Sequence, residues 1–197
     1  MKLAILIMAA GSSSRMGSIK QLLKIDGKTL LEKAIETSKK IRNTRIVCVL
    51  GAHAEVIKKQ INFEGVDFVI NNEYALGLST SIQSGITYLQ THNHPFEGVL
   101  ILLADQPAIE MQYYQDMARL FSENPEQIVA SSYGTKMGVP AIFPKEVLNE
   151  IMLIQGDKGA QGFLQQNKQK IVTPEISVNL FDLDTPEDYD SYLKTRK

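Results

Sequence analysis

Two cations in a loop of small side chains are the first residues of the sequence that suggest chemistry. Residues 9–20 read AAGSSSRMGSIK, so Arg15 and Lys20 stand among alanines, glycines and serines. Small side chains let backbone N–H groups approach an anion closely and form an anion-binding nest. A glycine–serine loop is also often a simple connection, and single cations are often solvated. The loop therefore predicts a polyphosphate site without yet excluding the plainer interpretation.

The spacing within this loop excludes two well-known phosphate motifs. A P-loop follows the pattern GxxxxGK[ST], but Met16 stands where its second glycine belongs. A dinucleotide fingerprint follows GxGxxG, and Ser13 stands at its second glycine. Oxidoreductases that depend on that fingerprint are accordingly disfavoured.

Aspartates form the second group of chemically interesting residues. Asp105 follows the apolar run GVLILL of residues 98–103, where an unpaired charge is costly. Asp105 therefore either caps the next helix or binds a ligand, and the sequence alone leaves both open. Asp182 and Asp184 are two residues apart, so on a strand they would point the same way.

Alternating strand and helix patterns must position these groups. The expected strands are Lys2–Met8, Arg45–Leu50, Asp67–Ile70, Gly98–Leu103, Gln127–Ser131 and Val139–Phe143, with weaker candidates at 171–172 and 180–183. The expected helices begin near Thr29, Ala54, Leu78, Glu110, Pro144, Ala160 and Thr185. Thr29 with Glu32 forms a capping-box pattern, and Thr185 precedes a proline suited to the first helical position.

This alternation predicts an α/β fold with a mostly parallel, mixed sheet between two layers of helices. No linker, repeat or low-complexity segment interrupts it, so residues 1–197 are expected to form a single domain. In such sheets, ligands bind beyond the carboxyl ends of the strands. The loop after the first strand and Asp105 would both lie there.

Composition narrows the class of partner. The chain has 197 residues, of which 44% are hydrophobic and 22% charged, with a formal net charge of −1. Nucleic-acid binding needs a basic surface, so this balance argues against DNA or RNA. No apolar run of about 20 residues exists, so no membrane span is expected. The single cysteine, Cys48, lies in an apolar run, which fits a buried thiol and a cytoplasmic protein.

Six ordered segments add a family resemblance. Residues 8–20 closely resemble the signature of the MobA-like nucleotidyltransferases, which share the Rossmann-like fold of the nucleotide-diphospho-sugar transferases. The supporting segments are residues 71–81, Ala104–Pro107, Gly138–Ala141, Gly156–Ala160 and Asp182–Asp188. The chain looks most like the molybdenum cofactor cytidylyltransferase branch. It departs from the family at Gln161, the position where the family usually has an arginine, which implies a difference in how the acceptor is bound.

The resemblance implies an Mg²⁺-dependent transfer of CMP from CTP to a phosphorylated acceptor, the molybdenum cofactor (molybdopterin), with release of pyrophosphate. It implies that Asp105 and, of the two later aspartates, Asp184 bind Mg²⁺. It also implies that Lys20 and Arg15 bind phosphates and that Gln106 faces the acceptor or the ribose. The nucleotide-binding residues would be Ala9, Ala10, Gly11, Ser12, Arg15, Lys20, Gly77 and Ser81.

Two alternatives accompany this interpretation. One is a nucleotidyltransferase that acts on a sugar phosphate or another small phosphate, which composition does not exclude. The other is a carrier that passes the molybdenum cofactor to a molybdenum hydroxylase without turnover. The presence of Lys20, Asp105 and Asp184 together disfavours the carrier, because a carrier needs no metal–triphosphate site.

Overall fold

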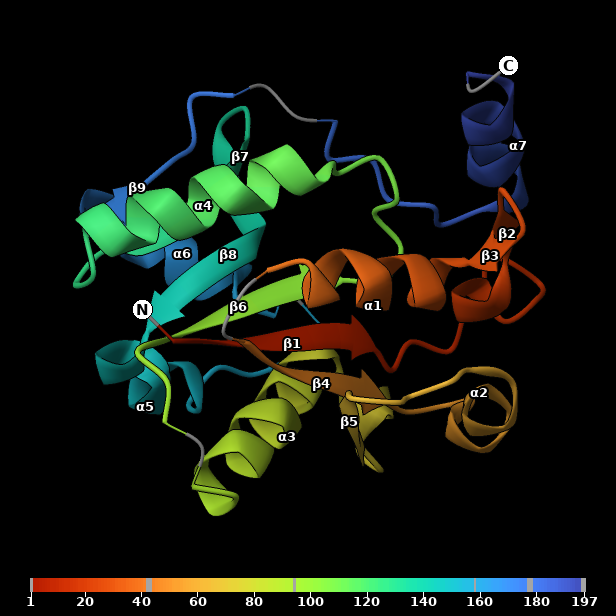
Figure 1. The fold of residues 1–197 in the computed structure, drawn as a ribbon, viewed down its shortest axis with the longest axis horizontal. Helices are drawn as coiled ribbons and strands as arrows, with labels where there is room; N and C mark the ends of the chain where they lie inside the picture. Colours follow the sequence, from red (N-terminus) through yellow and green to blue (C-terminus); the bar gives the residue numbers. More distant parts are fainter. Residues whose placement is uncertain (1, 42–43, 94, 158, 177–178, 196–197) are drawn as a thin grey trace.

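The structure is a computed structural model that describes residues 2–41, 44–93, 95–157, 159–176 and 179–195. Figure 1 shows a central sheet with helices on both of its sides. Lys158, within the expected segment Gly156–Ala160, lies outside the described residues.

Seven strands of the described chain form one mixed sheet in the order β5-β4-β1-β6-β8-β7-β9. Their bounds are β1 Leu3–Ala9, β4 Thr44–Leu50, β5 Asp67–Ile70, β6 Gly98–Leu103, β7 Ile128–Tyr133, β8 Lys136–Pro144 and β9 Ile171–Val172. Strand β1 pairs in parallel with β4 and β6, whereas β8 runs antiparallel to β6 and β7. The carboxyl ends of β1, β4 and β6 therefore meet at one edge of the sheet.

Successive residues of β1 face opposite sides of the sheet and belong to two separate cores. Leu3, Ile5 and Ile7 pack with residues of α1 (Leu30–Lys39), α2 (Ala54–Gln60) and α4 (Met111–Glu123). Ala4 and Leu6 pack with α3 (Leu78–Thr91), α5 (Leu148–Ile151) and α6 (Gln161–Gln166). In Figure 1, α1 and α4 accordingly lie on one side of the sheet, and α3 and α5 lie on the other. The predicted three-layer α/β/α fold with a mostly parallel mixed sheet is confirmed.

A small satellite core holds the end of the chain beside the loop that follows β1. Helix α7 (Pro186–Lys194) packs Tyr192 against Ile25 and Leu30, with Leu183 fully buried between them. Ile25 belongs to a short hairpin of β2 (Lys24–Ile25) and β3 (Lys28–Thr29). Figure 1 shows α7 beside this hairpin. Residues about 160 positions apart in the sequence thus become neighbours.

Several sequence expectations are confirmed in detail. Thr29 and Glu32 form the predicted capping box at α1, and Thr185 caps α7 with Pro186 in the first turn. Cys48 is buried within β4, and burial raises the pKa of its thiol.

One expectation is wrong. Residues 180–183 form no strand: Phe181 and Leu183 pack in the satellite core, and the Leu183 N–H donates to the Asp105 carbonyl (3.0 Å). The helix expected from Pro144 is present: Pro144 ends β8 and precedes the 3-10 turn Lys145–Val147, which continues directly into the short α5. Further 3-10 turns span Lys20–Leu22, Tyr74–Leu76 and Lys168–Lys170. Among the described residues, no helix is long and apolar enough to cross a membrane.

Candidate active site

The loop after β1 has its backbone carbonyls bonded to the protein. The Ala9 and Gly11 carbonyls accept hydrogen bonds from the Gln21 side chain at 3.0 and 3.1 Å. The Ala10 carbonyl accepts from the Ala52 N–H (3.2 Å), and a ring nitrogen of His53 lies 3.0 Å from the Ser12 carbonyl. The N–H groups of Gly11 and Ser12, in contrast, donate to no other described residue. The loop therefore presents donors, as an anion-binding nest requires.

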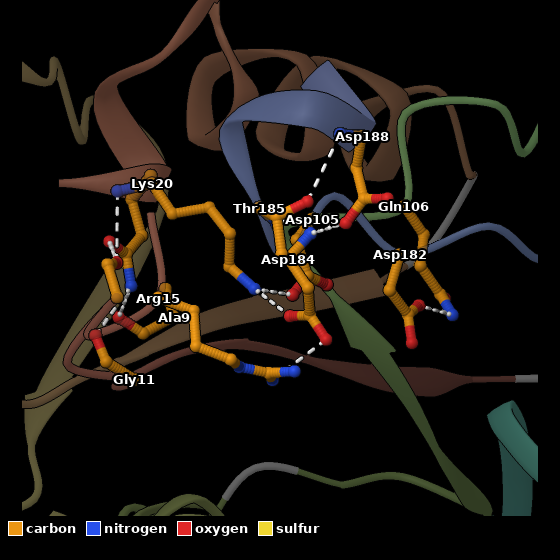
Figure 2. A network of polar contacts seen from close by, with 12 residues as sticks. Ala9, Gly11, Arg15, Lys20, Asp105, Gln106, Asp182, Asp184, Thr185 and Asp188 are labelled. Atoms are coloured by element: carbon orange, nitrogen blue, oxygen red, sulfur yellow. Dashed lines mark hydrogen bonds and ion pairs between the residues drawn. The ribbon is translucent and has the colours of Figure 1, made fainter. Parts of the chain in front are cut away.

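Lys20 lies where this loop meets two aspartates. Its ammonium nitrogen is 2.5 Å from Asp105 Oδ2 and 2.9 Å from Asp184 Oδ1. The other oxygen of Asp184 accepts a hydrogen bond from the Arg15 guanidinium at 2.9 Å. Figure 2 shows both cations directed at Asp184 from one side. The structure thus brings four predicted residues, far apart in sequence, into one charged cluster.

The charges in this cluster shift each other's pKa values. Burial by itself lowers the pKa of Lys20, but Asp105 and Asp184 outweigh burial and raise it above its ordinary value. Burial by itself raises the pKa of Asp184, yet its hydrogen bond to Lys20 and the charges of Lys20 and Arg15 lower it overall. Both residues are therefore charged near neutral pH.

The position of Asp184 depends on its neighbours in the chain. Leu183 is buried in the satellite core and bonded through its N–H to the Asp105 carbonyl. Next, the Asp188 carboxylate accepts hydrogen bonds from the N–H groups of Asp184 (3.2 Å) and Thr185 (2.9 Å). The capping box of α7 therefore fixes the backbone that carries Asp184.

Asp182 has different partners from Asp184. Its Oδ1 accepts a hydrogen bond from Gln106 Nε2 at 2.7 Å, and the same nitrogen lies 2.8 Å from the Tyr133 hydroxyl. Burial, followed by the negative charge of Asp105, raises the pKa of Asp182. In Figure 2, Asp182 and Gln106 form a pair apart from Lys20 and Arg15. The two aspartates thus belong to separate hydrogen-bond groups.

A pocket of about 800 Å³ opens beside the charged cluster. Nine residues expected to bind nucleotide or metal line it, namely Ala9, Ala10, Gly11, Ser12, Arg15, Lys20, Gly77, Ser81 and Asp105. Asp184 is not part of the lining and joins the site through Lys20 and Arg15. The loop after β1 and the segment that carries Gly77 and Ser81 therefore line the same pocket.

The wall opposite the loop needs a glycine. Gly77 has φ of 108°, a conformation that side chains rarely adopt. A Cβ at Gly77 would also lie 2.5 Å from Asp157 Oδ1. Nearby, the Ser81 hydroxyl accepts a hydrogen bond from the buried Asn71 side chain at 3.0 Å.

A metal ion fits the donor set at Asp105. Asp105 Oδ1 is buried and has no hydrogen-bond partner among the described residues, whereas Oδ2 is bonded to Lys20. Such a buried lone pair is costly unless a cation or a donor occupies its side. Among the described residues, no group of three or more histidine, cysteine or acidic side chains is arranged to hold a metal. One or two carboxylates completed by phosphates and waters match the preference of Mg²⁺.

Comparison with known proteins assigns the family. The model of the MobA-like NTP transferase domain matches residues 5–171, which run from within β1 to the first residue of β9 and include every residue that lines the pocket. The chain belongs to the MobA-like NTP transferase domain family. It is thus a nucleotidyltransferase of the MobA-like type, and the predicted resemblance is confirmed.

Curated relatives of this MobA-like domain carry different activities in their names. Nicotine blue oxidoreductase of Paenarthrobacter nicotinovorans is 29% identical, over 94% of this chain and 90% of that protein. Molybdenum cofactor cytidylyltransferase of Escherichia coli (strain K12) is 24% identical, over 93% of this chain and 92% of that protein. Family membership therefore does not by itself settle the substrates.

Solved structures share the fold of the MobA-like domain over its whole length. The homologue of Mycobacterium tuberculosis Rv0371c from Mycobacterium sp. strain JC1 superposes with a TM-score of 0.85 at 25% identity, covering 98% of this chain and 96% of that one. CTP:phosphocholine cytidylyltransferase from Streptococcus pneumoniae superposes with a TM-score of 0.72 at 15% identity, covering 100% of both chains. The nucleotidyltransferase fold expected from the sequence is confirmed.

Sequence reasoning did not single out several residues that shape the site. Tyr74 and Asp157 line the pocket, Gln21 holds the loop, and Asn71 holds Ser81. Tyr74 and Asn71 stand within the segment 71–81 that carries the resemblance, and Asp157 stands within Gly156–Ala160. Gln21 follows Lys20 directly, but a glutamine in that place has no distinctive pattern.

Proposed function

We propose that this chain transfers CMP from CTP to a phosphorylated acceptor, the molybdenum cofactor in its molybdopterin form, and releases pyrophosphate. The observation that carries the proposal is the meeting of Lys20 with Asp105 and Asp184 at the end of a loop with free N–H groups. Similarity to the E. coli molybdenum cofactor cytidylyltransferase over 93% of the chain supports the choice of base and acceptor.

The loop would bind the nucleotide through its backbone. The N–H groups near Gly11 and Ser12 would donate to CTP, with Gly77 and Ser81 on the opposite side of the pocket. Arg15, whose side chain is 70% exposed, would hold the departing pyrophosphate. Lys20, only 14% exposed, would hold a phosphate at the reacting phosphorus, because a buried charge is screened less by water.

Asp105 and Asp184 would hold Mg²⁺, with phosphates and water completing its ligands. When bound, the ion would neutralise charge on the phosphates. The free Oδ1 of Asp105 supports this assignment. Lys20 and Arg15 would leave the carboxylates and pair with phosphate oxygens, so their charges would remain compensated.

The reaction would need no general base from the protein. A phosphate acceptor is already ionised at neutral pH, and one of its oxygens would attack the α-phosphorus of CTP. A new P–O bond would form as the bond to the β-phosphate oxygen breaks, and the electron pair would leave with pyrophosphate. The chain's task would be to align two anions and stabilise the charge that develops on oxygen.

Pyrophosphate release tests the proposal. Purified protein with Mg²⁺ and molybdopterin should release pyrophosphate from CTP, and mass spectrometry should detect the cytidine dinucleotide of the acceptor. Release only with a sugar phosphate or a small alcohol phosphate would keep the transferase and change the acceptor. Tight binding of the cofactor without pyrophosphate release from any NTP would instead favour the carrier. Transfer of the cofactor from this chain to a molybdenum hydroxylase stays a prediction.

The name of the nicotine blue oxidoreductase defines a further outcome of the same experiment. Oxidation of NADH or NADPH in the presence of a dye acceptor, without pyrophosphate release from any NTP, would overturn the transferase activity for this chain. Asp105→Asn should abolish pyrophosphate release and leave any dye reduction unchanged if the two activities are independent.

A further inference from the structure

Gln21 is an uncharged side chain behind the nucleotide loop, and the proposed chemistry does not use it directly. It is 4% exposed and belongs to the 3-10 turn Lys20–Leu22. Its amide nitrogen donates to the carbonyls of Ala9 (3.0 Å) and Gly11 (3.1 Å). Its amide oxygen accepts from the Ser13 hydroxyl at 3.4 Å. All these partners belong to the loop.

The orientation of the Gln21 amide follows from its partners. Carbonyl oxygens only accept hydrogen bonds, so the atom facing Ala9 and Gly11 is the nitrogen. That nitrogen has two N–H groups, and each finds one carbonyl. The oxygen is then left for the Ser13 hydroxyl, so the side chain is satisfied on both sides.

The bonds from Gln21 decide where the donors of the loop point. In a trans peptide, the C=O and the following N–H lie on opposite sides. Holding the Ala9 carbonyl therefore directs the Ala10 N–H away from Gln21. Holding the Gly11 carbonyl does the same for the Ser12 N–H. Both loop residues line the pocket.

Ser13 extends this control to Lys20. The Ser13 hydroxyl accepts the backbone N–H of Lys20 at 3.0 Å while it donates to Gln21. Ser13 has φ of 56°, so its backbone is held in the left-handed region without a glycine. The same hydrogen-bond chain thus connects the anion-binding loop with the backbone that carries the ammonium group.

We propose that Gln21 is the positioning residue of this site: it directs the loop N–H groups to the nucleotide and, through Ser13, places Lys20 at the reacting phosphate. The inference rests on the proposed function. Gln21 also lines the pocket, but the role proposed for it is exerted through its hydrogen bonds to the loop. Loss of its amide should misalign several donors together, and errors of about 1 Å in such geometry cost roughly ten- to a hundredfold in rate.

The chain contains a matched control in Gln83. Its side-chain nitrogen also donates to two backbone carbonyls, those of Met152 (3.0 Å) and Ile154 (2.9 Å). Gln83 does not line the nucleotide pocket. Gln21→Met and Gln83→Met therefore remove the same kind of interaction from two places, and a merely structural role predicts the same result for both.

The test measures nucleotide affinity by calorimetry, steady-state kcat and KM, and the thermal midpoint. Gln21→Met should lower kcat/KM for the NTP about ten- to a hundredfold, whereas Gln83→Met should lower only the thermal midpoint. Equal kinetics for the two variants would overturn the inference. If the wild-type protein neither binds nor turns over any NTP, the proposed function itself fails, which is a separate result.

Ser13→Ala covers the case in which Gln21→Met does not fold. It removes only the link between Gln21 and the Lys20 N–H, so it should depress kcat more than nucleotide affinity. In a Lys20→Ala background the same change should have little further effect on kcat, because its route through Lys20 is already lost. Additive losses of kcat in the Ser13→Ala, Lys20→Ala double variant would contradict the proposal that Ser13 acts through Lys20.

Discussion

The ammonium nitrogen of Lys20 lies 2.5 Å from Asp105 Oδ2, so a proposed phosphate-binding cation pairs with a proposed metal ligand. The same nitrogen lies 2.9 Å from Asp184 Oδ1. While no substrate is bound, the charge of Lys20 is compensated by Asp105 and Asp184. If Asp105 and Asp184 hold a metal ion, the Lys20 ammonium group would compete with it for these carboxylates, and bound phosphates would offer the ammonium group another partner.

This pairing predicts that removal of the Lys20 ammonium group strengthens metal binding although it lowers activity. Lys20→Met should bind Mn²⁺ roughly tenfold more tightly without nucleotide, or ~1.4 kcal/mol, because no ammonium competes for the carboxylates. Turnover should fall by at least about a hundredfold. Mn²⁺ titration followed by electron paramagnetic resonance measures the affinity directly.

Lys28→Met is the control for that experiment. Lys28 also lies 2.5 Å from a carboxylate, that of Glu36, but both side chains are about half exposed on the surface. Its loss should leave Mn²⁺ binding and turnover unchanged. Unchanged or weaker Mn²⁺ binding in Lys20→Met would mean that Lys20 does not compete with the metal.

Substitutions of Asp182 and Asp184 should differ in how strongly they reduce turnover. Asp105→Asn and Asp184→Asn should each reduce kcat at least about a hundredfold, since each removes a charge next to the phosphates. Asp182→Asn should reduce kcat less, because Asp182 is bonded to Gln106 rather than to Lys20. Initial rates of pyrophosphate release, with circular dichroism to verify folding, give the comparison. A larger loss for Asp182→Asn would mean that Asp182 is the second metal ligand.

The same two aspartates should have opposite effects on stability in metal-free protein. The pKa of Asp184 is lowered on folding, so its ionised form stabilises the fold above the ordinary aspartate pKa, and that contribution is lost as pH falls through the lowered value. The pKa of Asp182 is raised, so its favourable contribution is present at low pH and is lost as pH rises through the raised value.

Urea unfolding in EDTA measures this difference. At pH 7, Asp184→Asn should lower the free energy of unfolding and Asp182→Asn should raise it. Both differences should shrink near pH 3, where the wild-type carboxyls take up protons. A stabilising Asp184→Asn at pH 7 would contradict the ion pairs seen in the structure.

Periodicity and motif spacing were sufficient to predict most of the fold. The continuous apolar runs of β1, β4 and β6 indicated buried parallel strands. The capping-box pattern at Thr29 and the proline after Thr185 located two helix starts. The strand predicted at 180–183 is absent, because Phe181 and Leu183 pack in the satellite core while Leu180 packs against a main core. Local pattern does not reveal which apolar surface a segment contacts.

The sequence indicated which residues belong to the candidate site but not how they pair. Lys20, Asp105 and Asp184 were predicted as one site, and the structure brings them together. The sequence did not reveal that Lys20 pairs with both carboxylates, since that depends on distances between segments 85 and 164 residues apart. Gln21 was missed for a related reason: its three partners are backbone carbonyls and a serine, which carry no sequence signature.

Gly51 should be needed to seat the nucleotide loop. A Cβ on Gly51 would lie 2.5 Å from the Ala10 carbonyl oxygen and 2.9 Å from the Tyr74 Cβ. Backbone must therefore move, and Gly51→Ala should cost ~1–3 kcal/mol of unfolding free energy and weaken NTP binding. Gly162→Ala is the control, because a Cβ there meets nothing within 4 Å and α6 should become slightly more stable. Wild-type NTP affinity in Gly51→Ala would show that the loop tolerates displacement.

The preference for one nucleobase over another should depend on Ala10, because its methyl group lies between the loop and the segment after β4. Ala10 lines the pocket and is 6% exposed, and its Cβ would lie 2.8 Å from a Cβ on Gly51. This close approach prevents the loop from moving closer to β4, and it therefore limits the depth of the pocket available to a base. A single pyrimidine ring should fit better than a purine, and one methyl group is worth ~1–3 kcal/mol.

We expect kcat/KM for CTP to exceed that for GTP roughly ten- to a hundredfold, and Ala10→Gly should reduce this ratio. Pyrophosphate release from all four NTPs with a common acceptor measures the ratio. Equal or faster reaction with GTP would remove the cytidylyltransferase assignment and leave the nucleotidyltransferase intact.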